Sequence, residues 1–551
     1  MKRKTSLDRL QSRDERFDML IIGGGASGLG AAVDAAARGH RVALIEQDDF
    51  AKAASSRSIK LAHGGMCHLK HGEISLARAM LRERSLLLRN APHLARSAPF
   101  VIPCYSWLDK FSHGLGVTMH ERLSGRLSLG KSRVLSREEV ASRVPTIEQH
   151  GLRGGALYHD CLFDDARLAI NLAQTAAARG AAPANYCACV ALLKENGKIR
   201  GAIARDMETG CEFPIRARVV LNATGVFADA MRRLDEPETE PLVVPSRGIH
   251  IVLPKKFLPG ASALMAPETA AGRAFFAIPW KGRVLVGVFG ATGATGATSA
   301  TGATGAISAP DAPGAPGTTG TLRAPIHAAT LEPRATPAEL DLVMEHARKH
   351  LALDPTENDV LSVFAGLRAR VKHGVGVSGD TVAHSRDHAI VISKSGLVTL
   401  TGGKWTSYRK MAEDAVDCAE RVAGIAHRPC VTATLPILGA EDAGKVDQYA
   451  SAAPVLAEPV HAAFPELRRA EVLWQVRNEM ARTVEDVLAR RTRALALDAR
   501  ATRAAAPAVA LLMASELGRD RAWVAAQEAA CVALANNSLM PSAHLPENAV
   551  E

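Results

Sequence analysis

A glycine-rich turn between two predicted strands constrains the fold of this 551-residue chain more than any other feature. Residues 17–47 read FDMLIIGGGASGLGAAVDAAARGHRVALIEQ, with the pattern G-x-G-x-x-G at Gly23, Gly25 and Gly28 before an alanine-rich helix. In such a βαβ unit the glycines let the backbone approach a pyrophosphate, and the helix N-terminus stabilises its negative charge. Glu46, eighteen residues after Gly28, is placed to accept hydrogen bonds from ribose hydroxyls. The unit predicts a dinucleotide site in a Rossmann-like domain, and a glycine turn without a ligand is the minor alternative.

Three further segments carry small residues where a bulky ligand would need space. Residues 219–229 (VVLNATGVFAD) and 396–415 (GLVTLTGGKWTSYRKMAEDA) are apolar strands that end in glycine turns. Residues 55–65 (SSRSIKLAHGG) add hydroxyl, basic and glycine residues after the βαβ unit. Because glycine lets the backbone pass close to a ligand, these segments favour a large cofactor that is crossed by several parts of the chain.

The composition excludes several classes of protein. The chain is 47% hydrophobic and 23% charged, which is ordinary for a soluble protein, and no apolar run reaches the roughly 20 residues of a membrane-spanning helix. Its first residues, MKRKTSLDRLQSRDERF, resemble neither a secretory signal nor a transit peptide, so a cytoplasmic location is expected. Nine cysteines without C-x-x-C spacing argue against disulfides and against a metal site. The net charge of +10 suits an anionic substrate or an anionic membrane surface, and with 4% aromatic residues nucleic acid is the weakest partner.

Two stretches near the C-terminus predict helices. Residues 471–488 (EVLWQVRNEMARTVEDVL) repeat apolar residues at three- and four-residue spacing, which is typical of an amphipathic helix. This helix is a surface for packing or for a partner, and a homodimer is one option that it leaves open. The arginine-rich residues 489–503 (ARRTRALALDARATR) are interpreted as a solvated helix face, with contact to lipid headgroups as the alternative.

Several phrases of the sequence resemble one family of flavoenzymes. Five segments are similar to the FAD-dependent glycerol-3-phosphate dehydrogenases, which are respiratory enzymes of bacteria and mitochondria. These segments are DDFAKAASSRSIKLAHGG, RERSLLLRNAPHL, LNATGVFAD, TGGKWTSYRKMAEDAVD and RNEMARTVEDVLARRTR. The likeness extends from about Phe17 to about Arg493 and is closer to the mitochondrial-type branch. It implies a D-amino-acid-oxidase-like architecture of α/β and α+β parts, with a discontinuous Rossmann-like FAD-binding domain, a substrate domain with an antiparallel sheet and a C-terminal α-helical domain. The expected ranges are 17–90, 155–235 and 380–425 for the FAD-binding domain, 91–154 and 236–379 for the substrate domain, and 430–551 for the helical domain.

The resemblance also implies an activity. The family oxidises sn-glycerol 3-phosphate to dihydroxyacetone phosphate, with non-covalently bound FAD and with quinone as electron acceptor, while attached peripherally to the inner face of the membrane. The residues expected to contact FAD are Gly23, Gly25, Gly28, Glu46, Ser55, Ser56, Arg57, Lys60, His63, Gly64, Gly65, Ala223, Thr224, Gly225, Gly402, Gly403, Lys404 and Thr406.

Three residues match positions at the family's substrate site. His250 in PSRGIHIVLP is the expected base, Arg368 in FAGLRARV lies beside the substrate, and Lys404 in TGGKWTSYR lies near flavin and substrate. Each has a simpler alternative: a histidine of the core, a surface arginine, and a solvated lysine in a turn. The acidic stretch FDDARLAIN (163–171) is interpreted as a helix N-cap.

A low-complexity segment at about 290–325 begins GATGATGATSATGATGA. His250 precedes it, whereas Arg368 and Lys404 follow it, although one substrate would need all of them. The segment is therefore expected to be an insert within the substrate domain and not a linker between domains. A strand at 282–290 leads into it, and a helix at 336–352, capped by Thr336 and Glu339, follows it.

Two departures from the family pattern fall at the expected substrate site. Cys67 and His68 stand where the family has Arg-Tyr, and Cys161 and Leu162 replace Gly and Gln. Loss of an arginine contact to a phosphate weakens binding by about one to two powers of ten. Three hypotheses therefore stay open: the dehydrogenase, an oxygen-using oxidase or relative with an altered substrate, and a weakly catalytic flavin-binding paralogue.

Overall fold

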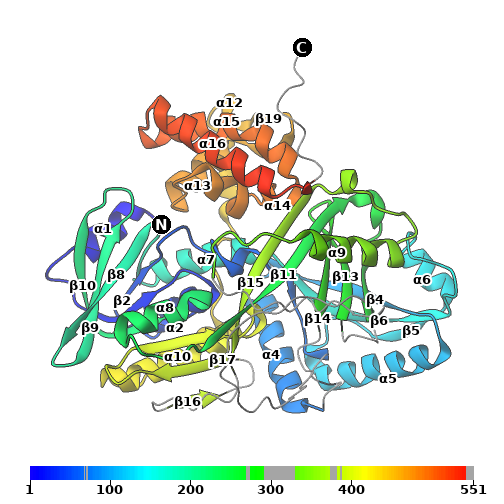
Figure 1. Cartoon of the computed structure of the whole chain (residues 1–551), viewed down its shortest axis with the longest axis horizontal. Helices are drawn as coiled ribbons and strands as arrows, with labels where there is room; N and C mark the ends of the chain where they lie inside the picture. Colours follow the sequence, from blue (N-terminus) through cyan, green and yellow to red (C-terminus); the bar gives the residue numbers. More distant parts are fainter. Residues whose placement is uncertain are drawn as a thin grey trace, which may run out of the picture.

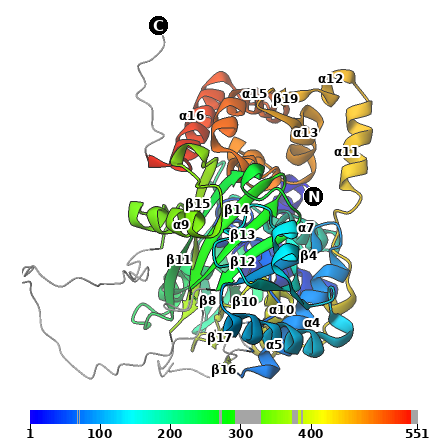
Figure 2. The same ribbon diagram turned by 90° about the vertical axis from the view of Figure 1, so that its right-hand side faces the viewer.

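The computed structural model describes residues 1–66, 69, 72–267, 273–290, 329–372, 381–384 and 388–541, and Figure 1 shows the chain as a whole. Cys67, His68 and most of the segment expected at about 290–325 lie outside these residues. The described residues form two large sheets, and a group of C-terminal helices lies on one side of both (Figures 1 and 2). No helix among them is both long and apolar enough to cross a bilayer.

The first sheet is built around the predicted βαβ unit. Its strand order is β16-β17-β18-β10-β1-β2-β7, with the β8–β9 hairpin added through β10. The strands are β1 (Phe17–Ile22), β2 (Val42–Ile45), β7 (Ala182–Ala184), β8 (Cys187–Glu195), β9 (Lys198–Asp206), β10 (Glu212–Asn222), β16 (Thr381–His384), β17 (His388–Ile392) and β18 (Val398–Gly402). Strand β1 is parallel to β2 and β10, and β10 is parallel to β18. The register places Ile22 opposite Ile45 and Asn222, so the turns that follow these strands lie along one edge of the sheet.

Alternation along β1 explains how this sheet is covered. Met19 and Ile21 point to a core that includes residues of α2 (Ala26–Ala37), α7 (Asp165–Ala178) and α10 (Tyr408–Ala423). Leu20 and Ile22 point to the opposite core, which includes residues of α1 (Arg3–Leu10) and the β8–β9 hairpin. Successive residues of a strand face opposite sides, so both faces of the sheet are buried, as expected of a parallel sheet.

The second sheet is mainly antiparallel. Its strand order is β15-β11-β14-β13-β12-β4-β6-β3, and β5 pairs with β6. The strands are β3 (Leu61–Ala62), β4 (Ala95–Cys104), β5 (Arg133–Leu135), β6 (Gly154–Phe163), β11 (Val243–Pro254), β12 (Ala263–Pro267), β13 (Arg273–Trp280), β14 (Arg283–Gly290) and β15 (Ser362–Val371). Strand β6 pairs with β4 along its whole length, so it belongs to this sheet, although residues from 155 onward were expected in the FAD-binding domain. The chain passes to the first sheet only at α7, which begins at Asp165.

The chain on either side of the insert belongs to this one sheet. Strand β14 precedes the insert and β15 follows it, and both pair with β11. Helix α9 (Pro337–His350) starts at the predicted cap, where the Thr336 hydroxyl accepts a hydrogen bond from the Glu339 backbone and the Glu339 carboxylate accepts one from Thr336. The segment therefore interrupts a folded sheet and does not connect two domains.

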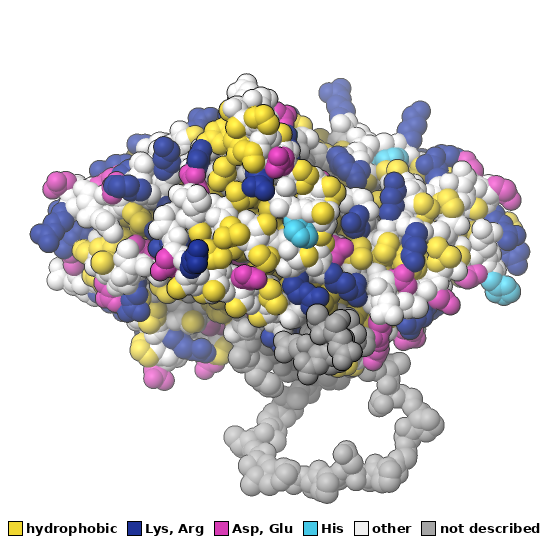
Figure 3. Space-filling model, turned by 90° about the horizontal axis from the view of Figure 1, so that it is seen from above, with side chains coloured by type: hydrophobic (Ala, Val, Ile, Leu, Met, Phe, Trp, Pro, Cys, Tyr) yellow, Lys and Arg dark blue, Asp and Glu magenta, His cyan; other side chains and the backbone are white. Residues whose placement is uncertain are grey.

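The C-terminal region contains α11 (Asp442–Ser451), α12 (Pro454–Ala457), α13 (Arg469–Asn478), α14 (Ala494–Leu497), α15 (Ala499–Leu517), α16 (Arg521–Asn537) and the hairpin β19–β20 (Pro459–His461 and Phe464–Arg468). Its outer face carries basic, acidic and apolar side chains intermixed (Figure 3).

The amphipathic helix expected over 471–488 is not continuous. Helix α13 ends at Asn478, Met480 has a φ of +55°, and a separate π-helical turn covers 486–491. Asp486 accepts hydrogen bonds from the backbone of Arg482 and Thr483, which starts this new turn. The solvated face predicted for 489–503 is wrong for its first part, because Arg490, Arg491 and Arg493 are buried.

Candidate functional site

The turn after β1 has no space for side chains. A Cβ atom on Gly28 would lie 1.9 Å from the carbonyl oxygen of Gly23, which has a φ of +113°. Gly25 is the N-cap of α2 and has no side chain to cap it, and a Cβ on Gly25 would lie 3.0 Å from the Ser55 hydroxyl oxygen. That hydroxyl accepts a hydrogen bond of 2.9 Å from the Ala26 N–H at the start of the helix. Gly25 itself offers no capping side chain, so apart from the contact with Ser55 the helix N-terminus favours the approach of a pyrophosphate.

Glu46 follows β2 beside this turn. Its carboxylate accepts hydrogen bonds from the Gly24 N–H (2.6 Å) and the Asp48 N–H (3.0 Å). Burial raises the pKa of Glu46 to about 7, although these two N–H groups oppose the shift. The carboxyl group is therefore held against the glycine turn, where it can bind ribose hydroxyls.

Two more predicted turns lie on the same edge. Gly225 (φ +61°) follows β10, whereas Gly402 (φ +82°) is the last residue of β18 and Gly403 (φ +77°) follows it. The Trp405 indole N–H, just after this last turn, donates 2.9 Å to the Ser55 carbonyl. We call the turns at 23–25, 223–225 and 402–403 the glycine edge. The segments that the sequence predicts to contact the cofactor meet at this edge. Buried Thr406 and half-buried Lys404 lie next to its last turn.

The loop 55–65 connects the glycine edge to the second sheet. The Gly64 N–H donates to the Asp160 carboxylate at 3.0 Å, and His63 and Gly65 flank it. Arg57 directs its guanidinium to the Leu331 carbonyl (2.8 Å) and the Glu332 carboxylate (2.6 Å), just after the insert. The arginine predicted to contact the cofactor therefore ties this loop to the segment that follows the insert.

Strands β11 and β15 present the predicted substrate residues on one face. The register pairs His250 with Phe364, Gly248 with Gly366, and Ser246 with Arg368. Because alternate residues of a strand share a face, His250 and Arg368 lie on the same side, with the glycine pair between them. A Cβ on Gly366 would lie 2.8 Å from the Arg57 carbonyl, so the loop 55–65 packs on this gap. Strand β15 also contacts β18, which leads to Lys404.

His250 and Arg368 differ in their surroundings. His250 is buried and stacks on Phe364, with ring centroids 4.7 Å apart. Burial lowers the pKa of His250 well below its usual value, and the nearby cations Lys60 and Arg368 lower it further. The Arg368 side chain is exposed, although nearby protein atoms lower its pKa by desolvation. The face thus combines a neutral imidazole with a guanidinium that remains charged.

Lys60 occupies a position that the sequence does not reveal. It was expected to contact the cofactor, but its ammonium group is buried and donates to the Asp165 carboxylate (2.7 Å) and the Ser56 carbonyl (2.8 Å). It lies 5.2 Å from the ring centroid of Phe364 and 5.5 Å from that of Trp280. Burial lowers the pKa of Lys60 to about 7. Asp164 is the predicted N-cap of α7, whereas the buried role of Asp165 was missed, since its partners lie far away in the sequence.

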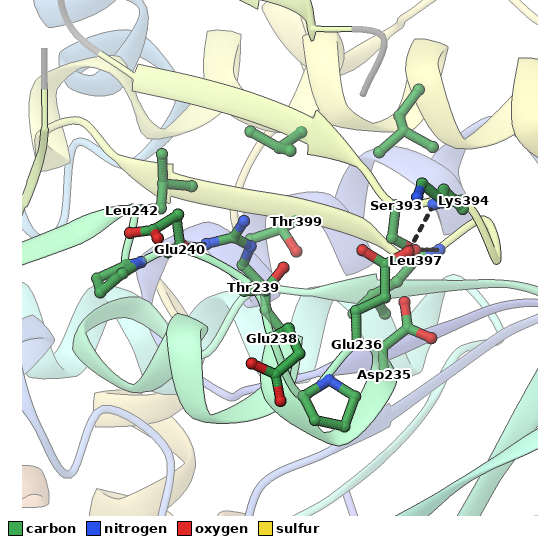
Figure 4. A pocket seen from close by; sticks show the side chains of 15 residues that line it. Asp235, Glu236, Glu238, Thr239, Glu240, Leu242, Ser393, Lys394, Leu397 and Thr399 are labelled. Carbon is green, nitrogen blue, oxygen red and sulfur yellow. Dashed lines mark hydrogen bonds between the residues drawn. The ribbon is translucent and has the colours of Figure 1, made fainter. Parts of the chain in front are cut away.

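A cavity of about 450 Å³ lies away from the glycine edge, at the opposite end of β18 (Figure 4). It is lined by Asp235, Glu236, Glu238, Glu240 and residues around Lys394. Carboxylates on several sides oppose an anionic ligand, so this cavity is a poor candidate for a phosphate ester.

One acidic group resembles a metal site. Ligand atoms of Asp417, Glu420 and His427 lie within 4.8 Å of one another. Glu420 accepts from His40 and His427 at 2.7 Å each, and Asp417 accepts from Arg38 at 2.6 Å. These hydrogen bonds and the pair of Arg38 with Asp417 account for the close approach of the three side chains.

Comparison with known proteins agrees with the fold and the glycine edge. The family model described as FAD dependent oxidoreductase matches residues 18–409, and that of the C-terminal domain of alpha-glycerophosphate oxidase matches residues 442–524. The mitochondrial glycerol-3-phosphate dehydrogenase of Homo sapiens is 33% identical over 94% of this chain and 73% of its own length. That of Schizosaccharomyces pombe is 32% identical over 92% of this chain and 85% of its own.

A solved structure shows the same architecture. The glycerol-3-phosphate dehydrogenase from Bacillus halodurans, complexed with FAD, is 24% identical, with a TM-score of 0.72 over 99% of both chains. The predicted fold class is confirmed: a Rossmann-like α/β domain, an antiparallel substrate sheet and a C-terminal helical region. With a glycine edge that fits the cofactor, this chain belongs to the FAD-dependent glycerol-3-phosphate dehydrogenase family and is an FAD-dependent oxidoreductase.

Proposed function

We propose that this protein oxidises sn-glycerol 3-phosphate to dihydroxyacetone phosphate. The names and similarity of its relatives support this substrate. The observation that carries the proposal is the register of β11 and β15, which puts buried His250 and exposed Arg368 on one face. A secondary alcohol with a phosphate group needs such a pair: a base for the hydroxyl and a cation for the phosphate.

Each residue has one task in this proposal. His250 accepts the proton of the C2 hydroxyl, which it can do because its low pKa keeps the ring neutral. Arg368 binds the phosphate through paired N–H donors, and Lys404 adds a second positive charge next to the glycine edge. Bound FAD supplies the acceptor for the hydride that leaves C2. The aromatic rings of Phe364 and Trp280 keep water from the buried side of His250 and Lys60.

An anaerobic titration tests the substrate. The purified protein with its flavin absorbance band is mixed with glycerol 3-phosphate, and with glycerol as control. Bleaching by the phosphate ester alone supports the proposal. A flavin that stays oxidised at high substrate concentration contradicts it and favours an altered substrate or a weakly catalytic paralogue, as the substitutions at Cys67 and His68 would allow.

We further propose that the electrons pass to quinone at an anionic membrane surface. Helix α5 (Trp107–Ser124) lies along the lower edge of the molecule in Figure 1. It exposes a row of apolar side chains. We call this row the α5 stripe; its residues, between 45% and 78% exposed, are Trp107, Leu108, Phe111, Leu115 and Met119. Exposed Arg122, Arg126 and Lys131 follow at the C-terminal end of the helix. An apolar stripe next to basic residues is typical of helices that lie in a lipid interface.

Sedimentation with lipid vesicles tests this surface. The wild type is expected to bind vesicles that contain about one third anionic lipid, and Phe111→Glu to reduce binding by at least tenfold. Met207→Glu is the matched control, because Met207 is also an exposed apolar residue but lies far from α5 on the β9–β10 turn. Equal binding of the two variants would contradict the role of the stripe. Hydrogen peroxide formed in air at the rate of substrate oxidation would favour the oxidase instead.

A further inference from the structure

Most charged side chains of the family-like segment 477–493 point into the body of the protein. Glu479 pairs with Arg167 at 2.6 Å, and Glu485 pairs with Lys52 at 2.5 Å. Arg490 and Arg491 both pair with buried Asp49, and Arg493 pairs with Asp165 at 3.0 Å. All of these partners precede residue 170, in the loop after β2 or at the start of α7. The C-terminal region thus docks on the cofactor-binding part of the chain through buried ion pairs.

Arg493 reaches closest to the proposed substrate face. Its side chain is 2% exposed, and its backbone has a φ of +69°, a conformation that residues other than glycine seldom adopt. One guanidinium nitrogen donates to the Ser56 carbonyl (2.7 Å) and to the Asp165 carboxylate (3.0 Å). The guanidinium carbon also lies 5.6 Å from the ring centroid of Trp280. A strained backbone that is maintained by specific contacts points to a functional constraint.

Lys60 contacts the same groups from the other side. It donates to the Ser56 carbonyl and to the second oxygen of the Asp165 carboxylate, and it too has a positive φ, +63°. Both cations also lie over the Trp280 ring. The Asp165 carboxylate is therefore held by one cation on each oxygen, and neither cation can move without disturbing the other.

We propose that Arg493 is a positioning residue of the active site, which fixes Asp165 and the Ser56 carbonyl and through them holds the Lys60 ammonium against Phe364 and His250. Phe364 links the two halves of this arrangement, since it lies 5.2 Å from Lys60 and stacks on His250. The C-terminal region thereby completes a site whose other residues come from the two sheets. The role of His250 rests on the proposed function, whereas the coupling of Arg493 to Lys60 does not.

The test compares kcat with substrate and cofactor binding. Arg493→Met is expected to lower kcat by roughly 10- to 100-fold, because small displacements of catalytic groups cost that much. KM and the flavin content are expected to change less than twofold, since Arg368 and the glycine edge are untouched. Arg493→Lys is expected to recover only part of kcat, because a lysine cannot reproduce the guanidinium geometry. Arg503→Met is the matched control: Arg503 is exposed on α15 and contacts Asn536.

Rescue by a small cation separates positioning from simple loss of structure. A cavity of about 70 Å³ lined by Ser56, Phe364, Arg490 and Arg493 adjoins the site. Millimolar guanidinium is therefore expected to restore part of kcat in Arg493→Ala, whereas urea at the same concentration does not. If activity per bound flavin in Arg493→Met equals that of the wild type, the inference is wrong.

Two further variants keep the test decisive. If Arg493→Met does not fold, Asp165→Asn is expected to show the same loss of kcat with KM unchanged, and full activity in that variant overturns the inference. A double-mutant cycle of Arg493→Lys and Lys60→Met in urea unfolding needs no substrate, and a coupling of at least tenfold in the unfolding constant is expected. Additive effects of the two substitutions on the free energy of unfolding contradict the inference. This result is independent of the proposed function, which is tested by bleaching of the wild-type flavin.

Discussion

His250 and Arg368 divide the proposed reaction between a buried neutral ring and a cation that faces solvent. Arg368 pairs with Ser246, which lies four residues before His250 on β11, so the two positions are about 13 Å apart along the sheet. The glycine pair between them has no side chains, and the loop 55–65 packs against it at Gly366. Proton transfer and phosphate binding can thus be changed separately.

Arg368→Lys tests the phosphate contact. The variant is expected to raise KM for glycerol 3-phosphate by roughly 10- to 100-fold, because lysine loses the paired N–H donors that match a phosphate. Binding of flavin should not change, since Arg368 is outside the glycine edge. Steady-state kinetics measure the effect, and Arg200→Lys, at an exposed position on β9, is the control. An unchanged KM would remove Arg368 from the substrate site.

Two helical glycines make opposite predictions for alanine substitution. In Gly28→Ala the new Cβ would lie 1.9 Å from a backbone oxygen, so we expect loss of bound flavin and destabilisation of more than about 3 kcal/mol. In Gly444→Ala on α11 the new Cβ has no heavy atom within 4 Å, so we expect stabilisation of about 0.5–1 kcal/mol. Flavin content and the urea midpoint measure both. Similar behaviour of the two variants would show that the turn after β1 is less closed than the geometry indicates.

At the scale of elements, α9 determines how the chain returns to the second sheet after the insert. Its buried residues Val343, Met344 and Ala347 belong to the core of that sheet. Glu339 completes the cap of the helix and also pairs with Arg247 of β11 at 3.0 Å. The cap therefore joins the start of the helix to the strand that carries His250.

The cap of α9 predicts a modest effect on stability. Thr336→Ala is expected to cost about 1 kcal/mol, because the Glu339 N–H loses the hydroxyl as an acceptor, whereas Thr336→Ser keeps the hydroxyl and most of the stability. Urea unfolding monitored by circular dichroism measures the difference. A loss in the serine variant as large as in the alanine variant would show that packing of the threonine methyl group, and not the cap, is responsible.

At the scale of the whole molecule, buried ion pairs join the C-terminal region to the cofactor-binding sheet. Burial alone would raise the pKa of Glu485, but Arg490 and Lys52 outweigh it and lower the pKa to about 2. The folded pKa lies below the ordinary value of 4.5, so the ionised carboxylate stabilises the fold above pH 4.5. That stability, on the order of 3 kcal/mol, is lost as the pH falls from 4.5 towards 2.

Acid unfolding tests this docking. The free energy of unfolding is expected to decrease between pH 4.5 and pH 3 in the wild type, measured by urea titration with tryptophan fluorescence. Glu485→Gln is expected to be less stable at pH 7 and to have a smaller pH dependence over this interval. An identical slope in wild type and variant would show that other carboxylates control the acid sensitivity.

The sequence by itself determined those features of the fold and the site that depend only on residues close together in the chain. The spacing of Gly23, Gly25 and Gly28 and the cap at Thr336 are local features, and the structure contains both as expected. Binding of ribose hydroxyls by Glu46 stays a prediction. The family resemblance is confirmed, and with it FAD as the cofactor and the overall fold.

Only the tertiary structure decided which distant residues meet. The segment 489–493 is predicted as a solvated helix face, but its arginines are buried and pair with Asp49 and Asp165, more than 300 residues earlier in the sequence. The helix that was expected to extend over 471–488 ends at Asn478, and Asp486 starts a separate turn by accepting hydrogen bonds from the backbone of Arg482 and Thr483. Strand β6 lies in the second sheet because of its pairing with β4, and no local pattern indicates that partner. A buried charge or a strand edge is stabilised by its partner, and the partner's place in space is set by the whole fold and not by the residues nearby in sequence.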